Sequence, residues 1–323
     1  MVGLVVALTT GAPAPAESAL RLDAGYRVGD FDWSIAGDPS EGPDVLSELS
    51  YNDLQIFQLR VEGDVTLTGR WVARLGVSFG EILNGESRDS DYGGDGRTLE
   101  WSRSIAETDG DELIDVVVGL GYEFWPGEKQ VVRVVPLVGV SYSEQNLRST
   151  NGQQTLSDGE IAALFEIGVP PLGSFEGLDS TYQTDWLGPW IGVEAELPRG
   201  NRWGLSGRAA YHWADYEAEA DWNLREDFEH PRSFKHEADG TGIVANAAGY
   251  FKPSGTYRLY LRVDYEDWST DAGIHQTYFS DGRRPVTRFN GANWESWTIS
   301  FGVDLLRSER KFSPAPPDED AAP

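Results

Sequence analysis

The stretch Val65–Phe79, VTLTGRWVARLGVSF, alternates between apolar and polar side chains over its whole length. One parity carries Val65, Leu67, Gly69, Trp71, Ala73, Leu75, Val77 and Phe79. The other parity includes Thr66, Thr68, Arg70, Arg74 and Ser78. A period of two predicts a β-strand, because successive side chains of a strand point to opposite faces. This strand is much longer than the roughly 5–6 residues usual in soluble proteins.

The same alternation recurs along the chain. It is clear at Leu20–Val28, Ile114–Phe124, Tyr257–Tyr265 and Trp297–Leu305. Weaker versions fall near 45–62, 131–148, 181–197, 202–218 and 241–253. No segment has a convincing helical period, so the sequence predicts an all-β protein with about ten strands.

The connections between these strands differ in length. Those near 81–112 and 149–180 are long, acidic and rich in Gly and Ser, whereas 126–129, 198–201 and 253–255 read as tight turns. Long loops at one end and short turns at the other are typical of a ten-stranded antiparallel transmembrane β-barrel. The apolar positions would then face lipid, and the charged positions would face water or a wet lumen. The alternative, a β-sandwich, normally uses shorter strands.

Composition narrows the function classes. The formal net charge is −27, which argues against nucleic-acid binding because that relies on Lys and Arg neutralising phosphates. Cysteine is absent, which excludes disulfides and thiolate metal sites and suits an oxidising compartment. The chain has 12 Trp and 13 Tyr, and such rings are expected at a membrane–water boundary.

The two ends differ from the middle. Residues 1–16 include a short apolar run followed by Ala-Pro-Ala, which we interpret as the remnant of a signal peptide; a disordered terminus is the alternative. Residues 17–306 would form one barrel domain, and the Pro- and acid-rich segment 307–323 a disordered tail. The sequence therefore predicts an exported protein of a bacterial outer membrane.

Several short segments carry a family resemblance. They are Val45–Tyr51 (VLSELSY), Asp89–Tyr92 (DSDY), Ser102-Arg103, Pro189–Gly192 (PWIG), and Tyr211 with Gly249-Tyr250. With the strands placed as above, the chain resembles the omptins, outer-membrane barrels that act as aspartyl-type endopeptidases. The resemblance implies the same barrel and a cell-surface protease activity as expectations.

The resemblance also implies a catalytic centre. Asp89 and Asp91 match the family's acid pair on one wall of the barrel. On the opposite wall, the family's Asp falls on Asp221 and its catalytic His on Asn223, in a gapless register from Tyr211 to Gly249. Asn cannot act as a general base, so a substitute is needed. His230 lies in the same connection and is the candidate, with His236 close behind it in the sequence.

The lipid contacts of the family carry over in part. Tyr142 and Glu144 match a lipopolysaccharide-binding segment, but Asn146 and Asp185 stand where the family has Arg. An Asp would not hold an anionic phosphate. The expected partners are outer-membrane lipids, including lipopolysaccharide, and peptide or protein substrates, with the barrel itself a monomer.

The acidic stretch Arg88–Arg97, RDSDYGGDGR, has two further interpretations. It can be a solvated loop at the start of the long connection after the third strand, or a calcium loop. Counted from Asp89, the sixth residue is Gly94 and the twelfth is Glu100, as a calcium loop requires. The fifth position is Gly93, which offers no side-chain ligand. We therefore expect no metal and no cofactor, apart from a possible dependence on lipopolysaccharide.

Two functional hypotheses follow. The first is a cell-surface endopeptidase with a degenerate centre formed by Asp89, Asp91, Asp221 and a substitute base. The second is a non-catalytic barrel that serves as an adhesin, a structural protein or a small-solute channel. The residue at position 223 is the sequence feature that separates them.

Overall fold

The computed structural model describes residues 17–40, 42–67, 69–127, 131–199 and 202–308. The predicted signal remnant at 1–16 and the predicted tail beyond Ser308 lie outside the described residues. No helix in the described ranges is long and apolar enough to span a membrane.

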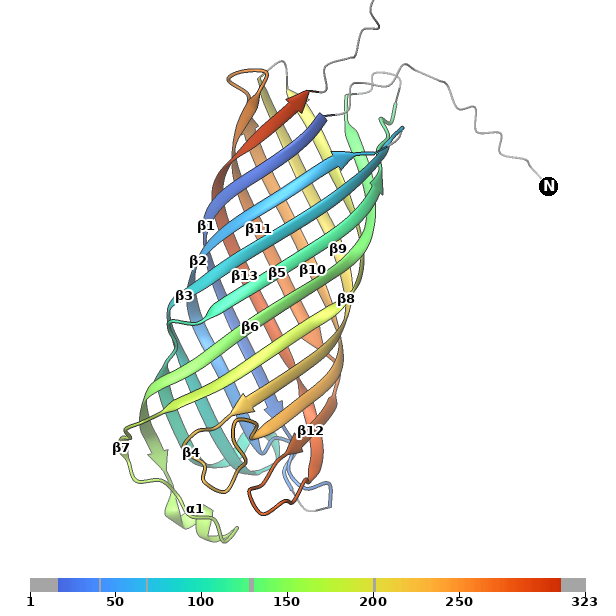
Figure 1. Ribbon diagram of the computed structural model, residues 1–323. Helices are drawn as coiled ribbons and strands as arrows, with labels where there is room; N and C mark the ends of the chain where they lie inside the picture. Colours follow the sequence, from blue (N-terminus) through green and yellow to red (C-terminus); the bar gives the residue numbers. More distant parts are fainter. Residues whose placement is uncertain (1–16, 41, 68, 128–130, 200–201, 309–323) are drawn as a thin grey trace, which may run out of the picture.

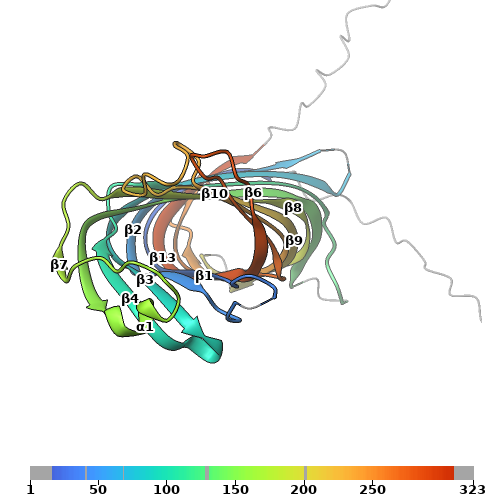
Figure 2. The ribbon, with the colours of Figure 1, turned by 90° about the horizontal axis from the view of Figure 1, so that it is seen from below.

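A single antiparallel sheet closes into a tilted ring, as Figures 1 and 2 show. Its long strands are β1 (Glu17–Ile35), β2 (Ser47–Thr66), β3 (Trp71–Gly94), β6 (Arg133–Ser157), β8 (Asp179–Arg199), β9 (Trp203–Asp221), β10 (Phe234–Phe251) and β13 (Val286–Ser308). Two further positions in the ring are each filled by two consecutive strands separated by a short break. One is β4 (Thr98–Glu107) with β5 (Glu112–Tyr122), and the other is β11 (Tyr257–Thr270) with β12 (Gly273–Thr277). The prediction of a barrel of about ten antiparallel strands is confirmed.

Closure comes from the first and last strands. β1 pairs with β13 from Glu17 opposite Ser308 to Ile35 opposite Phe289, and on its other edge it pairs with β2. The last strand therefore ends at Ser308 rather than near Leu306. Because the ring leaves none of its long strands with a free edge, their backbone groups are satisfied without water, as a lipid environment requires.

An apolar band surrounds the barrel. Its exposed side chains include Phe301, Ile299, Leu261 and Val138, each more than half accessible. Aromatic pairs lie near both margins of this band: Trp203–Phe251 and Trp71–Tyr122 near the short turns, and Tyr265–Trp297 and Tyr211–Trp213 near the other end. A band flanked by two aromatic girdles is the lipid-facing surface of an outer-membrane barrel.

This band predicts how a charge on it will behave. Replacing Phe301, whose side chain is 61% exposed near the middle of the band on β13, by Arg should lower the free energy of unfolding by about 2–4 kcal/mol. The cost arises because the guanidinium would have to enter hydrocarbon. Urea unfolding in lipid vesicles measures it, with Phe301→Leu as the apolar control. Equal unfolding midpoints for the two variants would contradict the lipid-facing assignment.

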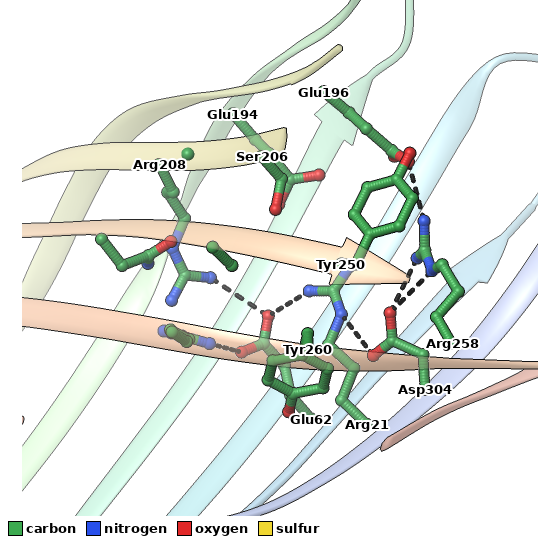
Figure 3. Close-up of a pocket in the computed structure, with 14 residues that line it drawn as sticks. Arg21, Glu62, Glu194, Glu196, Ser206, Arg208, Tyr250, Arg258, Tyr260 and Asp304 are labelled. Carbon is green, nitrogen blue, oxygen red and sulfur yellow. Dashed lines mark hydrogen bonds and ion pairs between the residues drawn. The ribbon is translucent and has the colours of Figure 1, made fainter. Parts of the chain in front are cut away.

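The interior has two layers of opposite chemistry. Near the short turns it holds buried ion pairs centred on Glu62, which contacts Arg21 at 3.0 Å, Arg262 at 3.2 Å and Arg208 at 3.3 Å (Figure 3). Toward the other end it holds a buried aromatic and aliphatic core that includes Phe31, Trp33, Leu54, Tyr182, Trp186, Tyr216, Phe289 and Trp294. The expected wet lumen is therefore wrong for that half, which is packed like the core of a soluble protein.

β1 shows how one strand serves both layers. Its even positions, Leu22, Tyr26 and Val28, face outward and are followed on the same face by Asp30 and Asp32. Its odd positions are buried, and they change from Asp23 and Arg27 to Phe31 and Trp33. The outward side chains thus change from apolar to acidic, and the inward ones change from charged to aromatic. The strand therefore leaves the membrane between Val28 and Phe31.

The long polar connection predicted at 81–112 is largely strand, and the one predicted at 149–180 is strand up to Ser157. β3 continues to Gly94 and β6 to Ser157, and both extend well beyond the apolar band (Figure 1). What remains of the first connection is a short 3-10 turn, η1 (Asp95–Arg97), and the break between Glu107 and Glu112. The second keeps a connection with the short helix α1 (Gly159–Ala163) and the two-residue strand β7 (Gly173–Ser174). These extensions form the mouth opposite the short turns, which outer-membrane barrels place outside the cell.

Candidate functional site at the barrel mouth

Asp89 and Asp91 lie on the extended part of β3, beyond Leu83, the last apolar residue that this strand exposes in the band. Asp89 is opposite Leu49 on β2, and Asp91 is opposite Ser47. Residues directly opposite each other in an antiparallel pair share a face, and Leu49 is buried in the interior core. The two carboxyl groups therefore face the inside of the mouth. The interpretation of RDSDYGGDGR as the start of a loop is wrong for its first half, which is strand.

The environment of the pair favours the protonated form. Burial and the negative charge of Asp91 raise the pKa of Asp89 to about 8, and burial raises the pKa of Asp91 to about 6. Ser47 Oγ donates only a long hydrogen bond of 3.4 Å to Asp89 Oδ1. Two carboxyl groups on the same strand face, with little hydrogen bonding, cannot both ionise cheaply. Around neutral pH we expect the pair to retain a proton.

This has a consequence for stability. Because the folded pKa of Asp89 is raised above its ordinary value of 3.8, the carboxyl binds a proton more tightly in the folded barrel. The free energy of unfolding should therefore fall as the pH rises from about 4 to about 8. Urea midpoints measured across this range should decline less steeply in Asp89→Asn. An identical decline in that variant would mean that Asp89 does not titrate in this range.

The opposite wall lacks the expected partners. Ala218 and Ala220 of β9 are buried in the interior core, and Trp222 packs against that core. Asp221 has the other parity, shared with the more exposed Glu217 and Glu219. Asp221 therefore points away from the mouth, and the expectation that it faces Asp89 and Asp91 is corrected. A one-residue difference in register exchanges the two faces of a strand.

Asp221 nevertheless has a histidine partner. His230 Nδ1 lies 2.5 Å from Asp221 Oδ1, with the His230 side chain 40% exposed. The two groups form an Asp–His pair at the rim, on the outer side of β9. The sequence proposed His230 as a substitute base, and the structure brings it to Asp221.

Asn223 has a structural role instead. Its Oδ1 accepts hydrogen bonds from the Asp179 backbone N–H at 2.9 Å and from Ser180 Oγ at 3.2 Å. Its Nδ2 donates to the Gly177 carbonyl oxygen at 2.7 Å. These bonds fasten the connection after β9 to the start of β8. Asn223 thus uses its polar atoms to hold these two segments together.

Comparison with protein families shows which family the chain belongs to. Residues 21–306 match the model of the Pom family, described as Protochlamydia outer membrane protein. The chain belongs to this family. None of the curated proteins compared with it is similar enough to count as a relative. Membership of this family of outer membrane proteins places the protein in the outer membrane.

Solved structures show what the Pom barrel resembles. The outer membrane protease OmpT from Escherichia coli superposes with a TM-score of 0.71, covering 91% of this chain and 97% of OmpT, at 13% identity. The transport unit of the Escherichia coli autotransporter AIDA-I follows with a TM-score of 0.37, 8% identity and 93% coverage of both chains. OprG from Pseudomonas aeruginosa gives 0.33, at 11% identity, covering 91% of this chain and 96% of OprG. At these identities the likeness to OmpT concerns the fold alone.

One residue of the mouth was missed by sequence reasoning. Arg225 lies in the connection between β9 and β10, and its charge lowers the pKa of both Asp89 and Asp91, against the larger effect of burial. Its own guanidinium is held by Asp227 through two hydrogen bonds of 2.9 Å. The connection thus brings a cation toward the acidic pair. A lone Arg in an acidic loop gave no sequence signal for this.

The residues expected to bind lipid form a closed group. The Tyr142 hydroxyl lies 2.6 Å from Glu144 Oε2 and 2.7 Å from Asp185 Oδ1, and Asn146 Nδ2 donates to Glu144 Oε1 at 2.9 Å. Among the described residues, no Lys or Arg forms an ion pair with either acid. This group does not suit a phosphate. Lipopolysaccharide binding through Tyr142 and Glu144 stays a prediction.

The ligands of the calcium interpretation have other partners. Asp95 Oδ1 accepts a hydrogen bond from the Asp44 backbone N–H at 3.0 Å, while Glu100 forms an ion pair with Arg103. Within the described ranges, no group of three acids or histidines is arranged to hold a metal ion. The contact between Asp95 and Asp44 fastens the β3–β4 hairpin to the connection after β1.

Proposed function

We propose that the protein is a non-catalytic outer-membrane barrel that binds a partner at the cell surface, in the manner of an adhesin. The observation that carries the proposal is the inner face of β9 opposite the acidic pair. That face presents Ala218 and Ala220, followed by Trp222, and none of these side chains can accept a proton. His236 of β10 and His275 of β12 are buried in the interior core, where His236 is hydrogen-bonded to Tyr182 and to His275. An acid pair without a base on the facing strand β9 lacks the group that would activate water for peptide hydrolysis.

The tip of the mouth supports a binding role. Leu164 and Leu172, in the connection around α1, are 71% and 65% exposed. No Lys or Arg occurs between Ser149 and Pro198, whereas this segment contains Asp158, Glu160, Glu166 and Glu176. An exposed apolar patch with an acidic rim fits a protein partner that carries both apolar and basic side chains. It does not fit a second copy of this chain, whose tip has the same charge.

The packing of the barrel interior argues against a small-solute channel, which was one of the non-catalytic alternatives. The cavities around Glu62 and Arg208 measure about 30, 70 and 60 Å³, enough for a few water molecules. Buried ion pairs and the aromatic core occupy the rest of the interior between them. Transport would require these side chains to move together.

A specific observation favours a second candidate, the endopeptidase. The Asp221–His230 pair has the hydrogen-bonded geometry of an oriented base, and Arg225 of the same connection already acts on the acidic pair. For hydrolysis, this connection would have to fold inward and carry His230 toward Asp89. That movement would also break the hydrogen bonds of Asn223.

The two candidates predict different results with a dibasic fluorogenic peptide. We expect the refolded barrel, supplied with lipopolysaccharide, to release no more fluorophore than Asp89→Ala or His230→Ala. Cleavage by the wild type that is reduced at least tenfold in both variants would overturn the proposal and favour the endopeptidase. Binding is measured separately, through the fluorescence anisotropy of a labelled peptide of alternating Lys and Leu. Leu164→Ser with Leu172→Ser should weaken it, while Leu224→Ser, at another exposed mouth leucine, should not.

A further inference from the structure

A groove crosses the outer wall of the barrel on the side away from β9. It has a volume of about 580 Å³ and is lined by residues of β1, β2, β3, β4 and β6. Tyr26 and Val28 form the edge nearer the apolar band. Much of the wall is formed by Gln55, Asn84, Asn151 and Gln153. None of the catalytic or lipid-binding residues predicted from the sequence belongs to it.

The groove exists because several strands bend at one level. The pairing of β1 with β2 shifts between Gly29 and Phe31, and that of β2 with β3 shifts around Asn52 and Gln55. At the same level there is a break between the end of β4 at Glu107 and the start of β5 at Glu112. Bulges of this kind bend a sheet locally and re-aim its side chains. The wall therefore forms a hollow without losing its closure.

Two non-glycine residues in the left-handed region line this hollow. Asp53 has φ 52° and Asn151 has φ 53°. This conformation is uncommon for residues with a side chain, and residues held in it cluster at ligand-binding positions. Here it turns the side chains of a bulge and of a strand toward the same groove.

The groove lies where the membrane ends. Tyr26 and Val28 are the last apolar residues that β1 exposes, and Asp30 follows them on the same face. On β2, Phe57 is the corresponding last apolar residue, before Gln55 and Asp53. The neighbours of a groove at this level are the headgroups of outer-leaflet lipids. The edge formed by Tyr26 and Val28 continues into the lipid-facing band.

The side chains of the groove define what it can hold. The amides of Gln55, Asn84 and Gln153 form no side-chain hydrogen bond with any described residue, so each can both donate and accept. Asp53, Glu86 and Glu107 add acceptors, and no Lys or Arg lines the groove. Glu86 has a distant cation, Arg88 at 3.9 Å, which does not line the groove. Three carboxylates in a lining without Lys or Arg repel phosphate, whereas amides and carboxylates together suit the hydroxyl groups of a sugar. The exposed ring of Tyr26 offers an apolar face to the same ligand.

We propose that this groove binds the uncharged sugar units of an outer-leaflet glycolipid, with the acyl chains extending past Tyr26 and Val28 along the apolar band. The glycolipid, rather than a free sugar, is the ligand because the groove opens directly above the apolar band. This inference is independent of the partner-binding function proposed for the tip around α1.

Native mass spectrometry of the detergent-solubilised barrel tests the proposal. The probe is a diacylglycerol that carries an uncharged disaccharide, compared with plain diacylglycerol and with the free disaccharide. We expect the glycolipid to bind at least tenfold more tightly than either. Gln55→Ala combined with Asn84→Ala and Gln153→Ala should abolish this preference. Gln183→Ala, which removes an exposed amide from the outer face of β8, should retain it.

Three outcomes would overturn the proposal. They are equal binding of glycolipid and plain diacylglycerol, equal binding by the triple variant and the wild type, and binding of the free disaccharide as tight as that of the glycolipid. Circular dichroism and a shift in gel mobility on heating confirm that each variant is a folded barrel before it is compared. A diacylglycerol with a phosphorylated sugar should bind more weakly than the uncharged one, because the acids of the groove would repel it.

Discussion

Replacing Glu62 by Gln should lower the free energy of unfolding by about 3–5 kcal/mol. Glu62 is 3% exposed, and its carboxylate lies within 3.3 Å of guanidinium groups of Arg21, Arg208 and Arg262. The amide of Gln has the same shape but no charge. Arg21 would keep Asp64 and Asp304, and Arg262 would keep Asp264. Arg208 forms no other ion pair with the described residues, so it would be left as a buried cation without its counter-charge. A buried charge without its partner costs far more than a surface pair contributes.

Equilibrium unfolding by urea in lipid vesicles, followed by tryptophan fluorescence, measures this loss. Glu295→Gln is the matched control, because Glu295 is exposed on the outer face of β13 and forms no ion pair with the described residues. We expect the control to keep the wild-type midpoint. If Glu62→Gln keeps it too, the ion pairs around Glu62 do not support the fold.

Replacing Trp186 by Ala should also cost about 3–5 kcal/mol, for a different reason. The Trp186 side chain is 1% exposed, and its ring centroid lies 4.5 Å from that of Tyr216 and 5.6 Å from that of Trp268. Its indole N–H donates a hydrogen bond to Gln145 Oε1 at 3.3 Å. The substitution removes a large apolar surface and leaves a cavity in the interior core of the mouth.

The same unfolding experiment distinguishes a cavity from a general disturbance. Trp186→Phe retains part of the ring and should lose much less stability than Trp186→Ala. Added indole should bind in the cavity of the Ala variant and raise its midpoint, with no effect on the wild type. Equal losses in the Phe and Ala variants, with no rescue by indole, would mean that Trp186 is not packed as described.

Much of the fold could be predicted because lipid imposes a simple pattern. Trp297, Ile299, Phe301 and Leu305 alternate with polar residues, and they lie on one exposed face of β13. Alternation shows which residues share a face, but it does not show which face meets lipid. In β1 the apolar residues change parity between Val28 and Phe31. That change was the available signal for the aromatic interior, but the predicted strand ended at Val28, before the change.

The mouth was harder to predict, because position along a strand and direction across it are separate questions. Asp89 and Asp91 were predicted to begin a loop, because glycines follow them, whereas the structure places them on the extended part of β3. Asp221 was placed by a register without gaps, and a single residue decides whether a side chain points into the mouth or away from it. The contact between Asp221 and His230 depends on the path of the connection after β9, which no periodic pattern specifies.

The pairing of Glu17 with Ser308 has a practical use. Both ends of the closed ring emerge beside the short turns, on the periplasmic side, so a tag fused to either end would be hidden from the surroundings of an intact cell. A foreign epitope meant for display would have to be inserted in the connection around α1. For the same reason, the two ends could be joined by a short linker and the chain reopened at that connection, which would give a rearranged gene whose product encloses the same ring.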